Sequence, residues 1–267
     1  MSALRLLGSE LRLMFGRRRN QAGLLVLCAV PILMGVALKL QRARPGGGLV
    51  GAATNGPFLA VASLAIETTI FLPLAISMVA GDSVAGEANQ GTLRYLLVVP
   101  AGRTRLLAVK FASIVVGSLA AVTLVAATGI VLGVALFGPV GATTLSGTQL
   151  TLGAALARVA LVVAYVAAGV TAIGAIGLFV STLTEQPLAA SISTMVVVAL
   201  SWAAEGVAQL DWLQPWLVTH WFTAALDLFR DPLLGTNVAR GLQLDAAYVV
   251  VFCLAAWARF TTKDVTS

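Results

Sequence analysis

The feature that most constrains this chain is a series of six apolar stretches, each approaching or exceeding the length of a membrane-spanning helix. A helix needs about 20 mostly apolar residues to cross the hydrocarbon core of a bilayer. We therefore predict an all-α, polytopic membrane protein whose residues 1–267 form a single domain. The six stretches are approximately Asn20–Leu38, Pro57–Gly81, Phe111–Phe137, Leu152–Ser181, Leu188–Glu205 and Leu242–Trp257.

The overall composition agrees with a membrane protein. Hydrophobic residues make up 59% of the chain and charged residues 10%, against about 45–50% and about 25% in soluble domains. The net charge of +6 is explained by topology, because basic residues collect on the cytoplasmic side of membrane proteins. A lipid bilayer is thus the expected surrounding, and no nucleic-acid partner is expected.

The distribution of Lys and Arg predicts the orientation of the chain. If the N-terminus is cytoplasmic, eleven of the 17 basic residues fall in inside segments, although the Lys39–Arg44 cluster lies outside. The positive-inside rule therefore places both termini in the cytoplasm and the protein in the cell membrane. Four acidic residues would then lie on the outer side: Asp211, Asp227, Asp231 and Asp245.

Two further segments are predicted to lie at the membrane surface. Within residues 1–19, apolar residues recur at helical spacing opposite Arg5, Ser9 and Arg12, which is typical of an amphipathic helix in the headgroup plane. Residues 206–241 contain the Trp-rich stretch Trp212–Phe229. Tryptophan is enriched at membrane interfaces, so we predict outer-side interfacial or re-entrant helices there. A seventh span is disfavoured by the polar residues in this stretch.

A polar interruption, Asp82–Lys110, separates the second and third spans. In this segment Asp82 or Ser83 can cap a short exposed helix that carries Glu87, and Gly91 can end it. Thr92 can cap a second helix that presents Leu93, and Pro100 would stop that helix. Arg103 and Lys110, two turns apart, are then expected at the lipid headgroups.

The sequence offers no catalytic or cofactor site. His220 is the single histidine, which excludes sites rich in histidine. None of the three lysines follows a glycine, so the chain has no phosphate-binding loop of the Gly-Lys-Ser/Thr type. We therefore predict that this chain is not itself an enzyme and holds no metal or cofactor.

Glu67 is an acidic residue inside the second span, where an ionisable side chain is expensive and normally faces protein or water. Two interpretations stay open. Glu67 can line a translocation path or a dimer interface. It can instead sit near the outer headgroups, hydrogen-bonded to Thr68 or Thr69. Pro73, soon after it, is expected to loosen the helix locally.

The order of these features resembles the membrane permease subunits of type-2 ABC transporters, the exporter-type family. The resemblance covers nearly the whole chain and rests on the pattern within residues 82–106 and on Lys110. That pattern consists of Gly86-Glu87, Gly91-Thr92-Leu93, Leu96-Leu97, Pro100 and Arg103. The family often carries charged residues where this chain has Ala88-Asn89-Gln90.

The resemblance implies that residues 82–106 form a cytoplasmic coupling segment that docks onto a separately encoded ATPase subunit. Glu87, Gly91, Thr92, Leu93, Pro100 and Arg103 would mediate this coupling. ATP and Mg²⁺ would bind to the partner, and a second permease copy would complete a dimer. The apolar spans suggest a hydrophobic or amphipathic cargo. The alternative is a stand-alone secondary transporter or channel.

Overall fold

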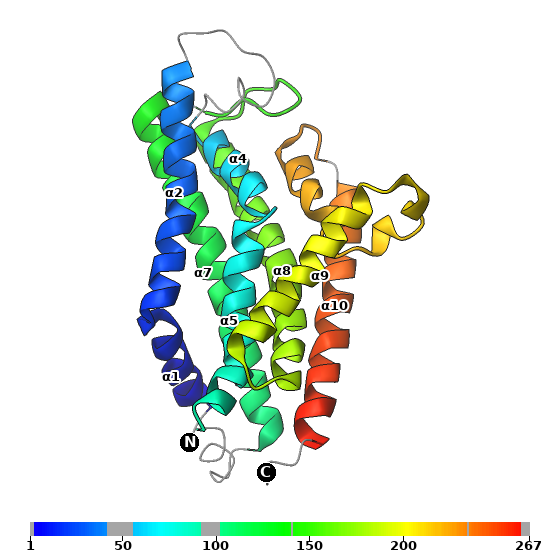
Figure 1. Cartoon of the computed structure of the whole chain (residues 1–267). Coiled ribbons are helices and arrows are strands. Elements are labelled where there is room, and N and C mark those ends of the chain that lie inside the picture. The colour runs from blue at the N-terminus through cyan, green and yellow to red at the C-terminus, as the bar shows by residue number, and fades with distance from the viewer. Residues whose placement is uncertain (1–2, 42–55, 92–101, 140, 234, 263–267) are drawn as a thin grey trace.

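The computed structural model describes residues 3–41, 56–91, 102–139, 141–233 and 235–262, most of them helical (Figure 1). Within these ranges there is no β-strand, only an isolated bridge between Thr143 and Gln149. The predicted all-α class is therefore confirmed. The α-helices are α1 (Ala3–Gly16), α2 (Arg18–Gln41), α4 (Phe58–Glu67), α5 (Phe71–Asn89), α7 (Arg103–Phe137), α8 (Leu152–Leu183), α9 (Pro187–Glu205) and α10 (Gly235–Thr262).

Five of the described helices are long and apolar enough to span a membrane individually: α2, α7, α8, α9 and α10. The predicted second span is instead a pair of helices, α4 and α5, bent by 58° at a short break. Counting this pair as one span gives six, in agreement with the sequence. Pro73 helps to explain the break, because it lacks the N–H that would bond to the carbonyl of Thr69 in a continuous helix.

The helices form an elongated bundle in which α8 is central. In its most apolar stretch 67% of the residues are buried inside the protein, against 17% for α10. The outer helices thus present apolar faces to their surroundings, as expected in lipid. The start of α1 and the end of α10 lie at the same end of the bundle (Figure 1), which is the arrangement that an even number of spans produces. We call this the termini end.

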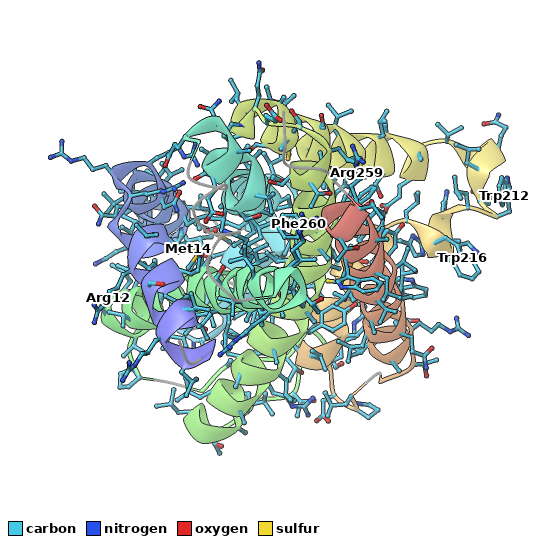
Figure 2. All side chains as sticks on the ribbon, turned by 90° about the horizontal axis from the view of Figure 1, so that it is seen from below. Arg12, Met14, Trp212, Trp216, Arg259 and Phe260 are labelled. Atoms are coloured by element: carbon cyan, nitrogen blue, oxygen red, sulfur yellow. The ribbon has the colours of Figure 1, made fainter. Side chains whose placement is uncertain are left out.

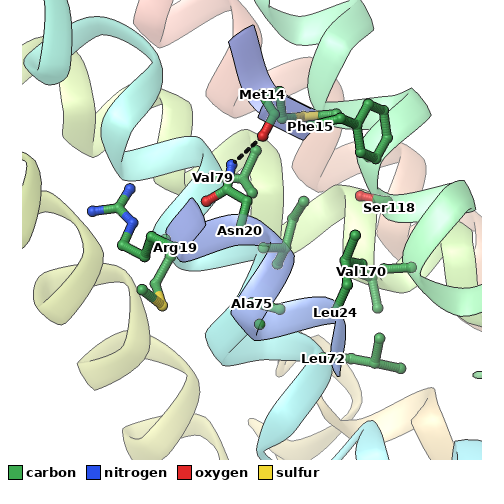
Figure 3. A pocket seen from close by; sticks show the side chains of 15 residues that line it. Met14, Phe15, Arg19, Asn20, Leu24, Leu72, Ala75, Val79, Ser118 and Val170 are labelled. Carbon is green, nitrogen blue, oxygen red and sulfur yellow. Dashed lines mark hydrogen bonds between the residues drawn. The ribbon is translucent and has the colours of Figure 1, made fainter. Parts of the chain in front are cut away.

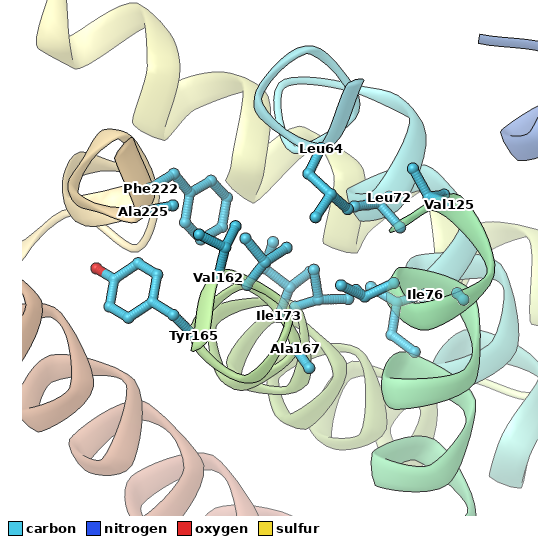
Figure 4. Close-up of a cluster of buried hydrophobic side chains, with 14 of the residues drawn as sticks. Leu64, Leu72, Ile76, Val125, Val162, Tyr165, Ala167, Ile173, Phe222 and Ala225 are labelled. Atoms are coloured by element: carbon cyan, nitrogen blue, oxygen red, sulfur yellow. The ribbon is translucent and has the colours of Figure 1, made fainter. Parts of the chain in front are cut away.

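A cluster of apolar side chains lies where α4, α5, α7 and α8 meet the segment that precedes α10 (Figure 4). Leu64, Leu72, Ile76 and Ile173 gather there from three helices, and Phe222 closes the cluster from one side (Figure 4). All five are buried. This packing holds both halves of the broken span against the central helix.

The two segments predicted at the membrane surface have different secondary structure. The first is the helix α1, and its placement in the headgroup plane stays a prediction. In the second, the described residues 206–233 contain no α-helix, and α10 begins at Gly235. These residues form short 3₁₀ helices instead: η1 (Ala208–Leu210), η2 (Gln214–Trp216) and η3 (His220–Phe229). Trp212 and Trp216 are exposed on this excursion and project from the side of the bundle (Figure 2).

Close helix crossings depend on small residues, and Gly129 of α7 allows a direct test. A Cβ atom at Gly129 would lie 2.6 Å from the Cα of Ala60 in α4. Gly129→Ala is therefore expected to lower the free energy of unfolding by about 1–3 kcal/mol, the usual range for overpacking. Gly153→Ala is the control, since nothing lies within 4 Å of its added Cβ. Reversible unfolding in mixed micelles measures the free energy of unfolding of both variants. If Gly129→Ala and Gly153→Ala change it equally, α4 and α7 do not pack closely at Gly129.

Candidate coupling site at the termini end

The predicted coupling segment begins inside a span rather than after it. α5 runs without interruption through Asp82 and Ser83 to Asn89, so the expected separate short helix is wrong. The Ser83 hydroxyl donates to the carbonyl of Ala80 rather than capping a new helix. The predicted end at Gly91 is confirmed: this residue has φ of +68° and its N–H donates to the carbonyl of Ala88.

Glu87 and Lys110 are largely buried, although the sequence predicted Glu87 on an exposed helix and Lys110 at the lipid headgroups. The Nζ atom of Lys110 lies 2.5 Å from Oε1 of Glu87 and 3.4 Å from Oε1 of Glu10. The Lys110 side chain is 1% exposed and that of Glu87 is 14% exposed. The placement of Lys110 at the lipid headgroups is therefore wrong. It lies between α5 and α1 because α7 runs back alongside both helices.

A second group of ion pairs joins the elbow between α1 and α2 to α5. Arg17, which lies between the two helices, forms an ion pair with Asp82. Nη2 of Arg19 lies 3.2 Å from Oδ2 of the same aspartate. The elbow is also closed internally, since the Asn20 amide donates to the carbonyl of Met14 at 2.8 Å (Figure 3).

Together these residues form what we call the inner charge network: Glu10, Arg17, Arg19, Asp82, Glu87 and Lys110. It contains three cations and three carboxylates, so its charges balance. A partly buried network of this kind stabilises only when every charge has a partner, because an unpaired buried charge is strongly destabilising. The network therefore fixes α1, α2, α5 and α7 to one another at the termini end.

Ser181 of α8 fixes α5 from the opposite side. Its hydroxyl donates to the carbonyl of Gly81 at 2.8 Å and accepts from the N–H groups of Val84 and Ala85 at 3.1 and 2.9 Å. A side chain inserted into the backbone ladder of a helix is a recognised cause of local bending. The inner turns of α5 are thus held between the charge network and α8.

Of the remaining predicted coupling residues, only Arg103 lies within the described part of the chain. Thr92, Leu93 and Pro100 lie outside the described residues. Nη1 of Arg103 donates to the carbonyls of Thr261 and Phe260 at 2.9 and 3.4 Å. Arg103 therefore satisfies free carbonyls at the end of α10, a contact that the sequence did not predict.

Three consecutive exposed residues, Asn89, Gln90 and Gly91, form the tip of α5. They lie one turn beyond the charge network. The coupling role of Glu87 and Gly91 stays a prediction, but the part of this surface that the structure describes is the α5 tip.

A cavity of about 60 Å³ lies beside the elbow between α1 and α2. Its lining is mostly apolar, with Leu24, Leu72 and Val79 among its walls and Arg19 and Asn20 at its polar side (Figure 3). No bound group is implied by this lining. Among the described residues, no three His, Cys, Asp or Glu side chains are grouped so as to hold a metal ion.

Glu67, the other candidate site residue, ends α4 directly at the break. It is fully buried, and among the described residues neither carboxylate oxygen has a hydrogen-bond partner. The predicted alternative of a bond to a neighbouring threonine is not seen for Thr68, whose hydroxyl donates to the carbonyl of Ala65. Glu67 is enclosed by this chain, while its role in a path or dimer stays a prediction.

Sequence reasoning missed a second buried acid, Asp245. The sequence places it with the outer acids, near the start of the span predicted at Leu242–Trp257, whereas α10 begins at Gly235 and carries Asp245 well inside the helix. Asp245 is 7% exposed and faces α8 near Gly169. The helical continuity of residues 235–241, which contain no proline, was the available signal.

The comparisons with known proteins place the chain in a family without giving its activity. A family model described as a protein of unknown function, DUF2705, matches residues 52–266. The chain belongs to the DUF2705 family. No curated protein matches the chain. The match covers α4 to α10 and thus contains the α5 tip and the broken span, whereas Glu10, Arg17 and Arg19 of the inner charge network precede it.

Proposed function

We propose that this DUF2705 protein is the membrane-spanning permease subunit of an ATP-binding-cassette exporter. The observation that carries the proposal is the α5 tip. It is exposed at the termini end and lies one turn beyond a charge network that joins α5 to three other helices. A surface so attached suits the transmission of force from a motor protein into the membrane.

In this proposal the chain supplies mechanical coupling and no catalysis. A separately encoded ATPase would bind ATP and Mg²⁺ and press on the α5 tip from the cytoplasm, where both termini would also lie. The ion pairs Lys110–Glu87 and Arg17–Asp82 would transmit that displacement to α7 and to the elbow between α1 and α2. A second permease copy would complete the pathway for a hydrophobic or amphipathic cargo.

A specific observation favours a second candidate, a stand-alone secondary transporter. The span formed by α4 and α5 is broken next to a buried acidic residue, Glu67. Discontinuous helices and intramembrane acids are typical of ion-coupled transporters. No repeat of the two halves is visible in the sequence, which is why we place this candidate second.

Cross-linking distinguishes the two candidates. The tagged chain with Asn89→Cys would be purified from its native membrane after treatment with a bifunctional reagent. The permease proposal predicts a stoichiometric cross-link to a P-loop ATPase that lacks spans of its own, and ATP hydrolysis by the complex. Trp212→Cys, exposed on the excursion, is the control and should not react with it. Transport that needs an ion gradient, with no ATPase attached, would support the second candidate.

A further inference from the structure

Glu67 combines burial, the lack of a hydrogen-bond partner and a position at the break of its span. It is 0% exposed, and both of its carboxylate oxygens lack a hydrogen-bond partner among the described residues. It also ends α4 at the point where the span bends by 58°. Burial without a partner removes every interaction that would stabilise the ionised carboxylate.

Among the described residues, no titratable group on the elements packed against α4 forms an ion pair or hydrogen bond with Glu67. On α2, Lys39 is exposed and the Cys28 sulfur accepts from Thr128. On α8, Tyr165 donates to the carbonyl of Trp221, and Arg158 donates to the carbonyls of Leu228 and Arg230. On η3, His220 and Asp227 line a separate cavity of about 380 Å³.

The remaining charged groups on packed helices lie farther along the chain. The section of α7 after Lys110 contains no charged residue, and Lys110 itself belongs to the inner charge network. Asp245 of α10 faces α8 near Gly169. Among the described residues, the Glu67 carboxyl therefore has neither a cation nor a hydrogen-bond partner in the bent span.

The break beside Glu67 has the local structure of a hinge. α4 closes with a bond from the Thr68 N–H to the carbonyl of Leu64, and the first bond of α5 runs from Leu74 N–H to the carbonyl of Ile70. Ile70, between the two helices, has φ of −137° and ψ of −51°, outside the helical region. The two halves are therefore connected by only a few non-helical residues.

We propose that Glu67 is a proton-binding site built into this break. The bent span holds the proton on the carboxyl. When α4 and α5 realign and water reaches the side chain, the O–H bond breaks, the proton passes to water as hydronium, and a carboxylate remains. Rebending reverses the step. The site takes a proton whether or not an ATPase is attached, so the inference does not rest on the proposed function.

The test measures the angle of the span as a function of pH. The native cysteines are first removed by Cys28→Ser and Cys253→Ser. Spin labels are then attached to Ile66→Cys and Leu74→Cys, which lie at exposed positions on either side of the break. Electron paramagnetic resonance in nanodiscs gives the distance between the labels. The protonated carboxyl stabilises the bent state and the ionised carboxyl stabilises the realigned state. Raising the pH should therefore increase the realigned-to-bent ratio, by up to about tenfold per pH unit for one proton.

Glu67→Gln is the matched control, because it keeps the size and neutrality of the protonated acid. It should stay bent at every pH. The infrared spectrum of the unlabelled wild-type protein at neutral pH should contain a protonated carboxyl band that disappears in Glu67→Gln. A distance that does not respond to pH, or responds equally in Glu67→Gln, would overturn the proposal. Absence of the infrared band would overturn it as well. Failure to find an ATPase would leave both readouts unaffected.

Discussion

Replacing Lys110 by methionine is expected to lower the free energy of unfolding by about 3–5 kcal/mol, the usual effect of removing one partner from a buried ion pair. Lys110 is 1% exposed, and its Nζ lies 2.5 Å from Oε1 of Glu87 and 3.4 Å from Oε1 of Glu10. Methionine fills similar space, so the loss arises from removing the Lys110 ammonium from two carboxylates and not from a cavity. Reversible unfolding in mixed micelles measures the change.

Two variants make this measurement specific. Arg105→Met removes a basic residue from the same helix at an exposed position and should change stability by no more than about 0.5 kcal/mol. Glu87→Gln combined with Lys110→Met should recover part of the loss, because it also removes the charge of the carboxylate that Lys110 contacts most closely. If Lys110→Met unfolds like Arg105→Met, the charge network does not stabilise the termini end.

The second large effect is expected at the α5 tip. Gly91→Val should reduce the amount of ATPase that co-purifies with the chain by about tenfold or more, which corresponds to about 1.4 kcal/mol or more of lost binding free energy. Gly91 has φ of +68°, a region that β-branched residues avoid. Valine would therefore strain the backbone where α5 ends, while its Cβ would meet nothing within 4 Å.

Gly147 supplies the control for this change. It also has a positive φ, +86°, and also has open space around an added Cβ. It lies between α7 and α8, at the opposite end of the bundle from the α5 tip (Figure 1). Gly147→Val should impose similar backbone strain and leave ATPase binding intact. Equal co-purification with both variants would remove the tip from the coupling surface.

The revised position of Glu87 also changes what a charge reversal would report. A Glu87→Arg variant would place a second cation beside buried Lys110, so it would disturb folding as well as any contact with a motor. For that reason Asn89 and Gly91, which are exposed, are better positions at which to examine coupling.

The apolar stretches and their interruptions by themselves determined the class and the approximate number of the spans. These features are local: about 20 apolar residues form a helix in lipid whatever surrounds them. The end of α5 at Gly91 was predictable for the same reason, since glycine is the residue that most easily adopts a positive φ.

The pairing of charges was decided by the tertiary structure. Lys110 and Glu10 lie a hundred positions apart, and only the packing of α1 against α7 brings them together. The same holds for Asp82, which the sequence suggested as a helix cap and which instead binds two arginines of the elbow. Whether a polar residue near a membrane surface faces water or a partner depends on which helices pack beside it. That choice is made by side-chain packing across the bundle, which local sequence pattern does not contain.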